Sequence, residues 1–368
     1  MSENVLFFEK VGALLPPVNY SAITFDDLDH PRLVAIYSLY WEISIVFSTG
    51  LFCFMLHMII TKSSKEMSDY KWYLVHQLTW SYIFDVYLGL WKPVPLWPFY
   101  IGYSAGIFSN VTANLVTLQL VILMLIIVGM GLSIYASVVH RYVQASPFST
   151  FYTYYSVLRY RVAFMVILYA TVALILCIPV IVTIPSQGEL KSALTTNYEI
   201  MEALFELHPS IFGYDTAIQK LSVVYIFVEV LLFVGVILSI ILLYLNFLRI
   251  LRKNRPNLSE ATYKMQIMLF RTLFIQLGSA VVLLILPIML ALILTMSGWK
   301  QVSSFSLIAI SFTGLHAATD FFITTYFIKS YREHVKSLVF KLLRKFGIKI
   351  SLEQTSVFGP ATVSSAIK

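Results

Sequence analysis

Charged residues are scarce in this sequence. Asp, Glu, Lys and Arg together make up 12% of the 368 residues, whereas an ordinary soluble domain carries roughly 25%. A chain of this length would need more charge to cover a water-facing surface, so a soluble enzyme is nearly excluded. Apolar residues account for 58% of the chain and aromatic residues for 15%, which excludes a disordered chain. The composition indicates a membrane protein.

Cysteine is scarce too, and the usual metal and cofactor motifs are missing. The two cysteines, Cys53 and Cys177, lie in apolar stretches, which excludes a disulfide scaffold. The seven histidines are scattered, and the sequence has no H-E-x-x-H, no paired C-x-x-C and no Gly-rich phosphate-binding motif. We therefore expect neither a metal site nor a cofactor. The N-terminus has no short apolar run followed by a small-residue cleavage site, so no removable signal peptide is expected.

Long apolar runs, by contrast, are frequent. A helix needs about 20 mostly apolar residues to cross the hydrocarbon core of a bilayer. The sequence predicts an all-α integral membrane protein, a seven-transmembrane helix bundle covering 37–328 after an N-terminal segment 1–36. The predicted spans are 37–60, 72–91, 104–139, 162–184, 221–248, 267–296 and 303–328.

The distribution of Lys and Arg predicts the orientation, because loops kept in the cytoplasm are enriched in these residues. Of the 26 Lys and Arg residues, 20 fall in the three loops and the tail on the side opposite the N-terminus. We therefore expect an extracellular N-terminus, a cytoplasmic C-terminus and a plasma-membrane location. The net charge of +7 then belongs to loops that face anionic lipid, and no nucleic-acid partner is expected.

The flanking segments carry their own signals. Asn19-Tyr20-Ser21 is a glycosylation sequon on the outer side, so Asn19 is expected to be modified. Residues 329–350 are predicted to form an amphipathic helix on the membrane surface, and tail residues 351–368 are expected to be disordered. The apolar face of that helix consists of Val335, Leu338, Val339, Leu342 and Phe346.

Ionisable side chains inside the spans are costly and therefore informative. They are Glu42, His57, Asp85, Glu229, His316 and Asp320. Asp85 and Glu229 are expected in the middle or outer half of the bilayer, and Asp320 nearer the cytoplasm. Two interpretations stay open: a ligand pocket or polar switch network, or hydrogen bonds that only hold the helices together.

Other residues in the spans extend this pattern. Asn110, Asn114 and Thr117 are spaced i, i+4 and i+7, and a polar stripe facing lipid would be expensive. We therefore expect the three residues to face the bundle interior, either in a small-molecule cavity near the outer mouth or in contacts between helices. Pro287 is expected to kink or loosen the sixth span. At the cytoplasmic end of the third span, Arg141 can hold a closed bundle through interhelical contacts, bind a partner or snorkel.

One motif invites an enzymatic interpretation. Gly102-Tyr103-Ser104-Ala105-Gly106 fits the G-x-S-x-G pattern of a serine-hydrolase nucleophile, which requires a strand before the serine and a helix after it. A proline-rich loop precedes Ser104, and no strand is predicted there. We expect the glycines to shape the start of the third helix, and no catalytic residue is predicted.

Four stretches carry a family resemblance. The first stretch is 67–74 with Trp80 and Asp85, and the second is 93–98 with Gly102, Tyr103 and Gly106. The third, in the sixth span and just before it, consists of Ser259, Thr262, Gln266, Ile275, Gln276 and Pro287. The fourth, in the seventh span and just after it, consists of Gly314, Leu315, His316, Tyr331 and Arg332. Together they resemble a nematode serpentine chemoreceptor of class H, or of the closely similar class I, in a divergent family of G-protein-coupled receptors. The resemblance implies a receptor in the cilium of a chemosensory neuron that binds a small molecule and activates a heterotrimeric G protein.

The polar residues inside the spans are the predicted ligand contacts: Asp85, Asn110, Asn114, Thr117 and Glu229. The resemblance implies that Arg141 couples to the G protein, and His140, Tyr142, Arg252 and Lys253 are predicted to take part in coupling with it. Structural or switch roles are predicted for Pro287, His316, Asp320, Tyr331 and Arg332. His140 stands where rhodopsin-type receptors carry an acidic residue, so a contact between Arg141 and an acidic neighbour is not expected. The oligomeric state, homo- or hetero-oligomer, stays open.

Two other classes of membrane protein were weighed. A seven-helix ligand-gated cation channel of the insect odorant-receptor type has the opposite orientation, which the distribution of Lys and Arg disfavours. A secondary transporter usually shows paired halves and interrupted helices, and this chain has an odd number of predicted spans and no internal repeat. The receptor is therefore the favoured class, with the channel as its main alternative.

Overall fold

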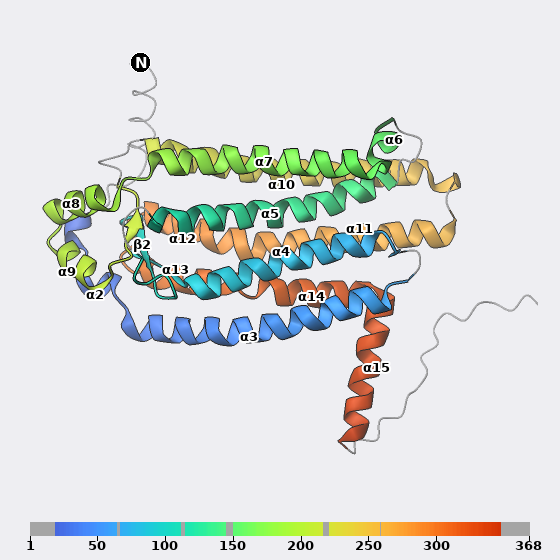
Figure 1. The fold of residues 1–368 in the computed structure, drawn as a ribbon, viewed down its shortest axis with the longest axis horizontal. Helices are drawn as coiled ribbons and strands as arrows, with labels where there is room; N and C mark the ends of the chain where they lie inside the picture. The colour runs from blue at the N-terminus through green and yellow to red at the C-terminus, as the bar shows by residue number, and fades with distance from the viewer. Residues whose placement is uncertain are drawn as a thin grey trace, which may run out of the picture.

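The computed structural model of the chain describes residues 19–64, 67–111, 115–144, 150–215, 221–257 and 259–346. In these residues, seven long helical segments lie alongside one another (Figure 1). They are α3 (Pro31–Lys62), α4 (Tyr70–Trp91), α5 (Leu115–Gln144), α7 (Leu158–Thr183), α10 (Leu221–Lys253), α11 (Glu260–Ala280) continued by η4 (Val281–Ile285) and α12 (Leu286–Met296), and α13 (Val302–Thr313) continued by α14 (His316–Phe327). The predicted seven-helix membrane bundle is confirmed.

The outer surface of the bundle is apolar. Five helical stretches of the described residues are long and apolar enough to cross a membrane: Phe25–Lys62, Thr117–Gln144, Leu158–Thr183, Tyr263–Met296 and Val302–Phe327. The α7 helix is the clearest case of outward apolar side chains, since Val166, Ile167 and Val182 are 61%, 65% and 71% exposed. Such a surface suits contact with lipid tails, where unpaired polar groups are costly.

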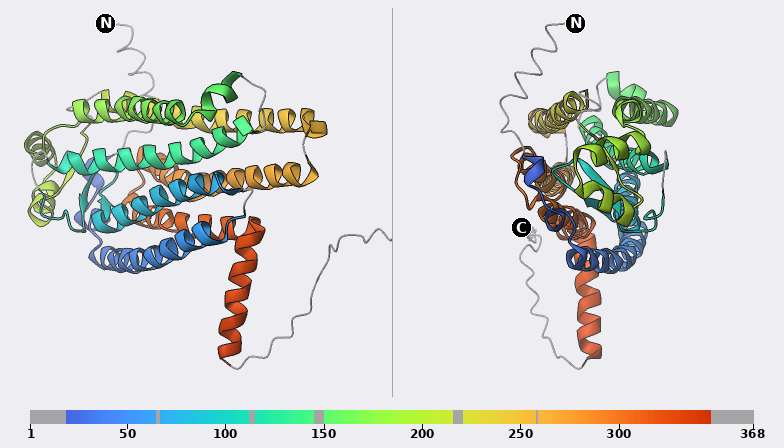
Figure 2. Two further views of the ribbon diagram at one scale, coloured as in Figure 1. Left: turned by 45° about the vertical axis from the view of Figure 1, so that its right-hand side comes forward. Right: turned by 90° about the vertical axis from the view of Figure 1, so that its left-hand side faces the viewer.

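One end of the bundle, which we call the sheet end, is covered by a small cap. An antiparallel sheet of β1 (Pro93–Pro95), β2 (Ile101–Ser104) and β3 (Phe212–Gly213) lies there with β2 in the middle. The cap also contains the short helices η1 (Tyr20–Ala22), α2 (Phe25–Leu28), α8 (Gln187–Asn197) and α9 (Ile200–Leu207). Figure 2 shows α8 and α9 lying across this end of the bundle.

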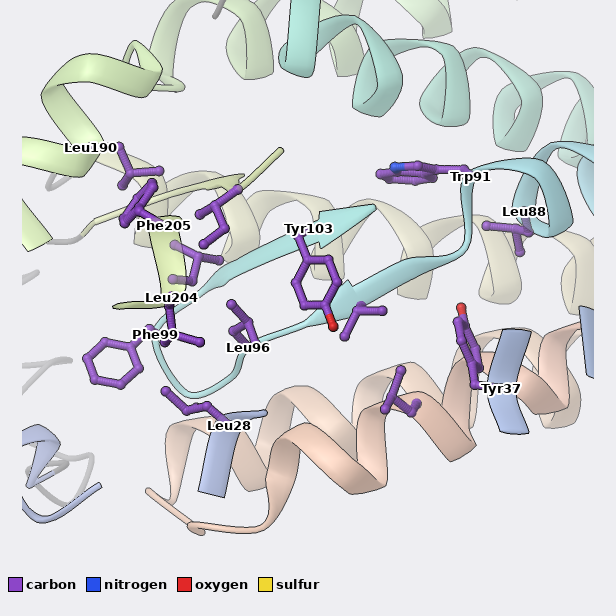
Figure 3. Packing of buried hydrophobic residues seen from close by; sticks show 14 of the residues in the cluster. Leu28, Tyr37, Leu88, Trp91, Leu96, Phe99, Tyr103, Leu190, Leu204 and Phe205 are labelled. Carbon is purple, nitrogen blue, oxygen red and sulfur yellow. The ribbon is translucent and has the colours of Figure 1, made fainter. Parts of the chain in front are cut away.

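The cap has a continuous apolar core. Leu96, Leu204 and Ile211 are fully buried, as is Trp41 of α3 beneath them. Figure 3 shows Leu28, Leu96, Phe99, Tyr103 and Leu204 packed around the β1–β2 hairpin. The side chains of the cap therefore fill the sheet end of the bundle.

The prediction of a third span at 104–139 began the helix too early. Ser104 is the last residue of β2, the chain turns through Asn110, and α5 is described from Leu115 to Gln144. Val94 pairs with Tyr103 across the hairpin, so the backbone groups of this apolar stretch are paired between strands. A short buried strand and a buried helix segment look alike by apolarity alone.

The sixth and seventh spans are both interrupted. The π-helix η4 comes directly before α12, whose first turn contains Pro287. Because proline lacks an amide donor, a π-bulge is one way to accommodate it, and the predicted loosening of this helix is found. In the seventh span, α13 and α14 meet at Gly314, where a Cβ atom would lie 2.9 Å from the Tyr40 hydroxyl oxygen and 3.2 Å from the Trp41 ring.

The opposite end, which we call the α15 end, has a second apolar core and the shorter elements α6 (Thr150–Ser156) and η3 (Arg255–Asn257). The α15 helix (Lys329–Lys345) leaves the bundle here at a steep angle (Figure 1). Tyr331 anchors its first turn, since it is fully buried and shares a 2.7 Å hydrogen bond with Ser63, the residue that follows α3. On the predicted apolar face, Leu342 and Phe346 are exposed. The predicted tail 351–368 lies outside the described residues.

Candidate functional site

A cluster of polar side chains lies inside the bundle, between α3, α4, α11 and α14. Its members are Ser48, Gln77, Ser81, Asp85, Gln276, Ser279, His316, Asp320 and Thr324. Gln77, Ser81 and Asp85 are spaced i, i+4 and i+8, which places them on one face of α4. Four spans of the bundle therefore contribute to one buried polar site.

Hydrogen bonds join the helices in pairs. The Ser48 hydroxyl of α3 donates to Asp85 Oδ2 of α4 over 2.9 Å. The Gln276 amide of α11 donates to the Thr324 hydroxyl of α14 over 3.0 Å, and Ser279 donates to Asp320 Oδ1 over 3.4 Å. These bonds connect α3 with α4 and α11 with α14.

Several buried polar atoms of the cluster lack a hydrogen-bond partner among the described residues. Among the described residues, Asp85 Oδ1, the Ser81 hydroxyl and His316 Nδ1 have no hydrogen-bond partner, although Asp85 and His316 are 1% and 0% exposed. His316 Nε2 lies 3.8 Å from Asp320 Oδ2, beyond hydrogen-bond distance. A cavity of about 20 Å³ beside Ser81 and Asp320 has room for one water-sized group. Buried polar atoms without partners are rare, so this cluster has spare hydrogen-bonding capacity for a water or a ligand group.

Among the residues predicted to bind ligand, the three whose side chains are described do not form one site. Asp85 belongs to the buried cluster. Asn110 lies in an exposed turn before α5, so the predicted i, i+4, i+7 helical face does not include it. Thr117 is half-buried in the first turn of α5, whereas Asn114 and the side chain of Glu229 lie outside the described residues.

A second site lies at the α15 end, where Arg141 of α5 is 1% exposed. Its guanidinium carbon is 3.5 Å from the centroid of the Tyr70 ring of α4, and its Nη1 donates to Gln144 over 2.9 Å. The His140 ring stacks on Tyr73 at 4.2 Å between centroids. Arg141 is therefore held inside the bundle by an aromatic ring, at a position where no acidic neighbour is present in the sequence.

Some of the other residues predicted to couple or to switch lie at the same end of the bundle, whereas His316 and Asp320 belong to the first cluster. The Tyr142 hydroxyl accepts a 3.0 Å hydrogen bond from Asn246 of α10, and Arg252 and Lys253 are exposed at the end of α10. Arg332 Nη1 donates to the carbonyl of Tyr326 over 2.8 Å, which ties α15 to the end of α14.

Sequence analysis missed some members of both sites. Ser48, Ser279 and Thr324 gave no signal because single polar residues occur throughout membrane helices, and Gln276 was noted only as part of a family stretch. Tyr70 lies in one of the family stretches, but an aromatic residue looks like core. The i, i+4, i+8 spacing of Gln77, Ser81 and Asp85 was a signal that could have found the polar face of α4.

Ser104 is held by structural contacts. A strand is present where none was predicted, because β2 ends at this residue. The Ser104 side chain is buried, and its hydroxyl donates to the carbonyl of Trp91 over 2.6 Å. Its amide donates to the Ser210 hydroxyl over 3.1 Å. The hydroxyl therefore joins the cap to the end of α4. Among the described residues, no group of three metal-ligating side chains lies together.

The fold is a seven-helix membrane bundle with two buried polar sites between its helices. The sequence matches the family described as "Serpentine type 7TM GPCR chemoreceptor Srh" over residues 34–341. The chain belongs to this family, which confirms the class H resemblance. No curated protein matches the chain in sequence.

Proposed function

We propose that this protein is a chemosensory receptor that binds a small-molecule cue and activates a heterotrimeric G protein at the α15 end. The observation that carries the proposal is the burial of Arg141 against Tyr70, at the end of the bundle where Arg252 and Lys253 are exposed. In this orientation the N-terminus and the cap are extracellular, the α15 end is cytoplasmic, and Asn19 is available for glycosylation. The receptor would act in the plasma membrane of a sensory cilium.

Activation in this proposal is a shift between two arrangements of the helices. The cue binds in the half of the bundle nearer the cap, where Asp85, Asn114, Thr117 and Glu229 are the proposed contacts. Binding of the cue changes the hydrogen-bond partners within the polar cluster, and the new hydrogen bonds favour a shift of α4 and α14. Tyr70 of α4 then moves away from Arg141. The freed guanidinium and the basic end of α10 would contact the G protein. The interrupted helices at Pro287 and Gly314 are suited to such a shift because their backbone hydrogen bonding is already irregular.

The first test is topology. Epitope tags at both ends are stained in intact and permeabilised cells. The N-terminal tag should stain in intact cells and the C-terminal tag only after permeabilisation. The reverse pattern would overturn the orientation and favour the channel alternative. Staining of both tags on one side would contradict seven crossings.

The second test measures coupling without a known ligand. G-protein dissociation sensors are read in cells that express Tyr70→Leu, which frees Arg141, and in cells that also carry Arg141→Ala. We expect raised ligand-independent signalling in the first and loss of that signalling in the second, at equal surface staining. Signalling that is the same in both would remove Arg141 from the proposed coupling site.

A further inference from the structure

A large groove lies on the side of the bundle between α4, α5 and α7. It encloses about 830 Å³, within the range of roughly 300–1,000 Å³ found for small-molecule sites. The α5 helix lies between α4 and α7 and packs against both (Figure 1). It is lined by Trp72, His76 and Trp80 of α4, Gly129 of α5, and Val166 and Tyr169 of α7, among others. Trp72, Val162 and Val166 are more than half exposed, so the groove opens sideways, toward lipid.

The deep end of the groove is aromatic and closely packed. A Cβ atom on Gly129 would lie 2.5 Å from the Trp80 ring, so the absence of a side chain allows Trp80 to lie against the backbone of α5. The Tyr169 ring of α7 stacks beside Trp80 at 6.1 Å between centroids. The Trp80 indole donates to His76 over 3.0 Å, which satisfies its polar atom. This end of the groove is therefore an apolar surface, and the Trp80 indole needs no hydrogen bond from a ligand.

The other end is polar, with Asp69, Ser156 and Arg161 in the lining. From Asp69 to Trp80 the α4 helix rises about 16 Å, at about 1.5 Å per residue. That length is about half of a 30 Å hydrocarbon core. The length of the groove therefore matches the thickness of one leaflet of the bilayer. Its polar end lies at the membrane surface on the side of α15.

Charge at the polar end favours an anion. Arg161 is half-buried, and its guanidinium carbon lies 5.6 Å from the Tyr155 ring. Within the described residues, no carboxylate lies within 4.0 Å of its nitrogens. Lys71 and Arg159 are sequence neighbours of the lining residues Trp72 and Leu158, and among the described lining residues Asp69 is the one carboxylate. A guanidinium binds a phosphate through two parallel hydrogen bonds, and Asp69 can accept from an ammonium group.

We propose that this groove binds an acidic aminophospholipid of the phosphatidylserine class. Arg161 binds its phosphate, Asp69 accepts from its amino group, and one acyl chain lies along α5 against Trp80 and Tyr169. In the proposed orientation the lipid belongs to the cytoplasmic leaflet, which is rich in such headgroups.

Lipid in this groove would also contact the Arg141 site. Tyr73 lines the groove, shares a 3.1 Å hydrogen bond with Tyr155 and stacks on His140, the neighbour of Arg141. A lipid bound in the groove therefore affects the packing of Tyr73 and His140 beside Arg141. This consequence rests on the proposed function, whereas lipid binding itself does not.

The test is photolabelling of the purified full-length receptor in phosphatidylcholine nanodiscs. The probe is a phosphatidylserine with a diazirine in one acyl chain, and the labelled peptides are identified by mass spectrometry. We expect labelling on α5 around 129–136 and on the facing side of α7. Arg161→Gln should lower it about fivefold, since one arginine at a membrane surface contributes about 1 kcal/mol to binding an anionic lipid. Arg252→Gln removes one charge from the same end of the bundle and should leave the labelling unchanged.

Two substitutions on α7 separate the groove from the general lipid surface. Val166→Trp fills the groove and should remove most of the labelling, whereas Ile167→Trp, at a neighbouring residue of similar exposure outside the lining, should not. Wild-type melting temperature and elution volume show which variants are folded. Equal labelling of Arg161→Gln and wild type would overturn the proposal. Equal labelling by a phosphatidylcholine probe, or preferential labelling by a sterol probe, would also overturn it. None of these outcomes depends on G-protein coupling, which the sensor assay tests separately.

Discussion

The guanidinium of Arg141 lies over the ring of Tyr70, with 3.5 Å between the guanidinium carbon and the ring centroid. The contact joins α5 to α4 at the α15 end, and both residues are nearly fully buried. A cation over an aromatic face is attracted by the ring quadrupole, by about 2 kcal/mol when the pair is away from water. An aromatic residue on a neighbouring helix can therefore hold Arg141 inside the bundle, in a sequence that has His140 at the adjacent position.

Removing the ring of Tyr70 should raise ligand-independent signalling. A loss of about 2 kcal/mol corresponds to about a thirtyfold shift toward the arrangement in which Arg141 is free. Tyr70→Leu removes the ring, and Tyr70→Phe keeps it. We expect higher basal G-protein dissociation for Tyr70→Leu and near-wild-type values for Tyr70→Phe, normalised to surface expression. Equal signalling by the two variants would mean that the ring does not hold Arg141.

The hydrogen bond between Ser48 and Asp85 should make these two residues energetically coupled. Ser48→Ala leaves Asp85 with one partner fewer, and Asp85→Asn weakens the acceptor, so each substitution should lower the melting temperature. Because both act on the same bond, the double variant should lose less than the two single losses combined. The coupling should be about 0.6 kcal/mol, a typical value between membrane helices. Thermal unfolding of the four proteins in one detergent measures it, and additive losses would contradict the bond.

Two glycines of α5 form a matched pair for a stability test. A Cβ atom on Gly129 would meet the Trp80 ring at 2.5 Å, whereas one on Gly131 would have nothing within 4 Å. Gly129→Ala should therefore destabilise the receptor by about 1–3 kcal/mol, the usual cost of overpacking. Gly131→Ala should be neutral or slightly stabilising, because alanine is the better helix former. Melting temperatures of the two variants decide between these outcomes, and a similar loss in both would place Trp80 elsewhere.

The sequence predicted the membrane fold well because apolar length is what a bilayer requires. It did not predict the cap. The segment 185–220 looked like a loop, although Ser186 and Glu189 form the reciprocal capping box that begins α8. The β2 strand was missed because a proline-rich loop was expected before Ser104, and the third helix was predicted to begin at Ser104, the last residue of that strand. Strand pairing depends on residues far away in the chain, and hydropathy carries no information about them.

The polar sites were predicted in part. Asp85, His316 and Asp320 stood out because ionisable groups in a span are costly. Their neighbours Ser48 and Gln276 did not, since their part in the cluster depends on how each helix is rotated about its axis. Arg141 was expected at the end of the third span, but its partner Tyr70 becomes visible only once α4 and α5 are placed side by side.

Acid should destabilise the cap through His208. Its ring stacks on Tyr103 at 3.6 Å between centroids, and its Nε2 lies 3.6 Å from Asp29 Oδ1. Burial lowers the pKa of His208 below its ordinary value of 6.5, and the nearby carboxylate of Asp29 opposes that shift only in part. The folded protein therefore binds fewer protons at this site than the unfolded chain does. Stability from this group is fully present above about pH 6.5 and is lost as the pH falls through the lowered pKa.

The measurement is the melting temperature of the purified receptor between about pH 7.5 and 5. His208→Phe keeps a ring against Tyr103 and has no proton to gain, so we expect a flatter pH profile with a similar melting temperature at neutral pH. Asp29→Asn removes the charge that favours protonated His208, which lowers the pKa further and should steepen the loss in acid. A profile that His208→Phe leaves unchanged would show that other groups cause the acid sensitivity. A shallower loss in Asp29→Asn would contradict the role of the Asp29 carboxylate in favouring protonated His208.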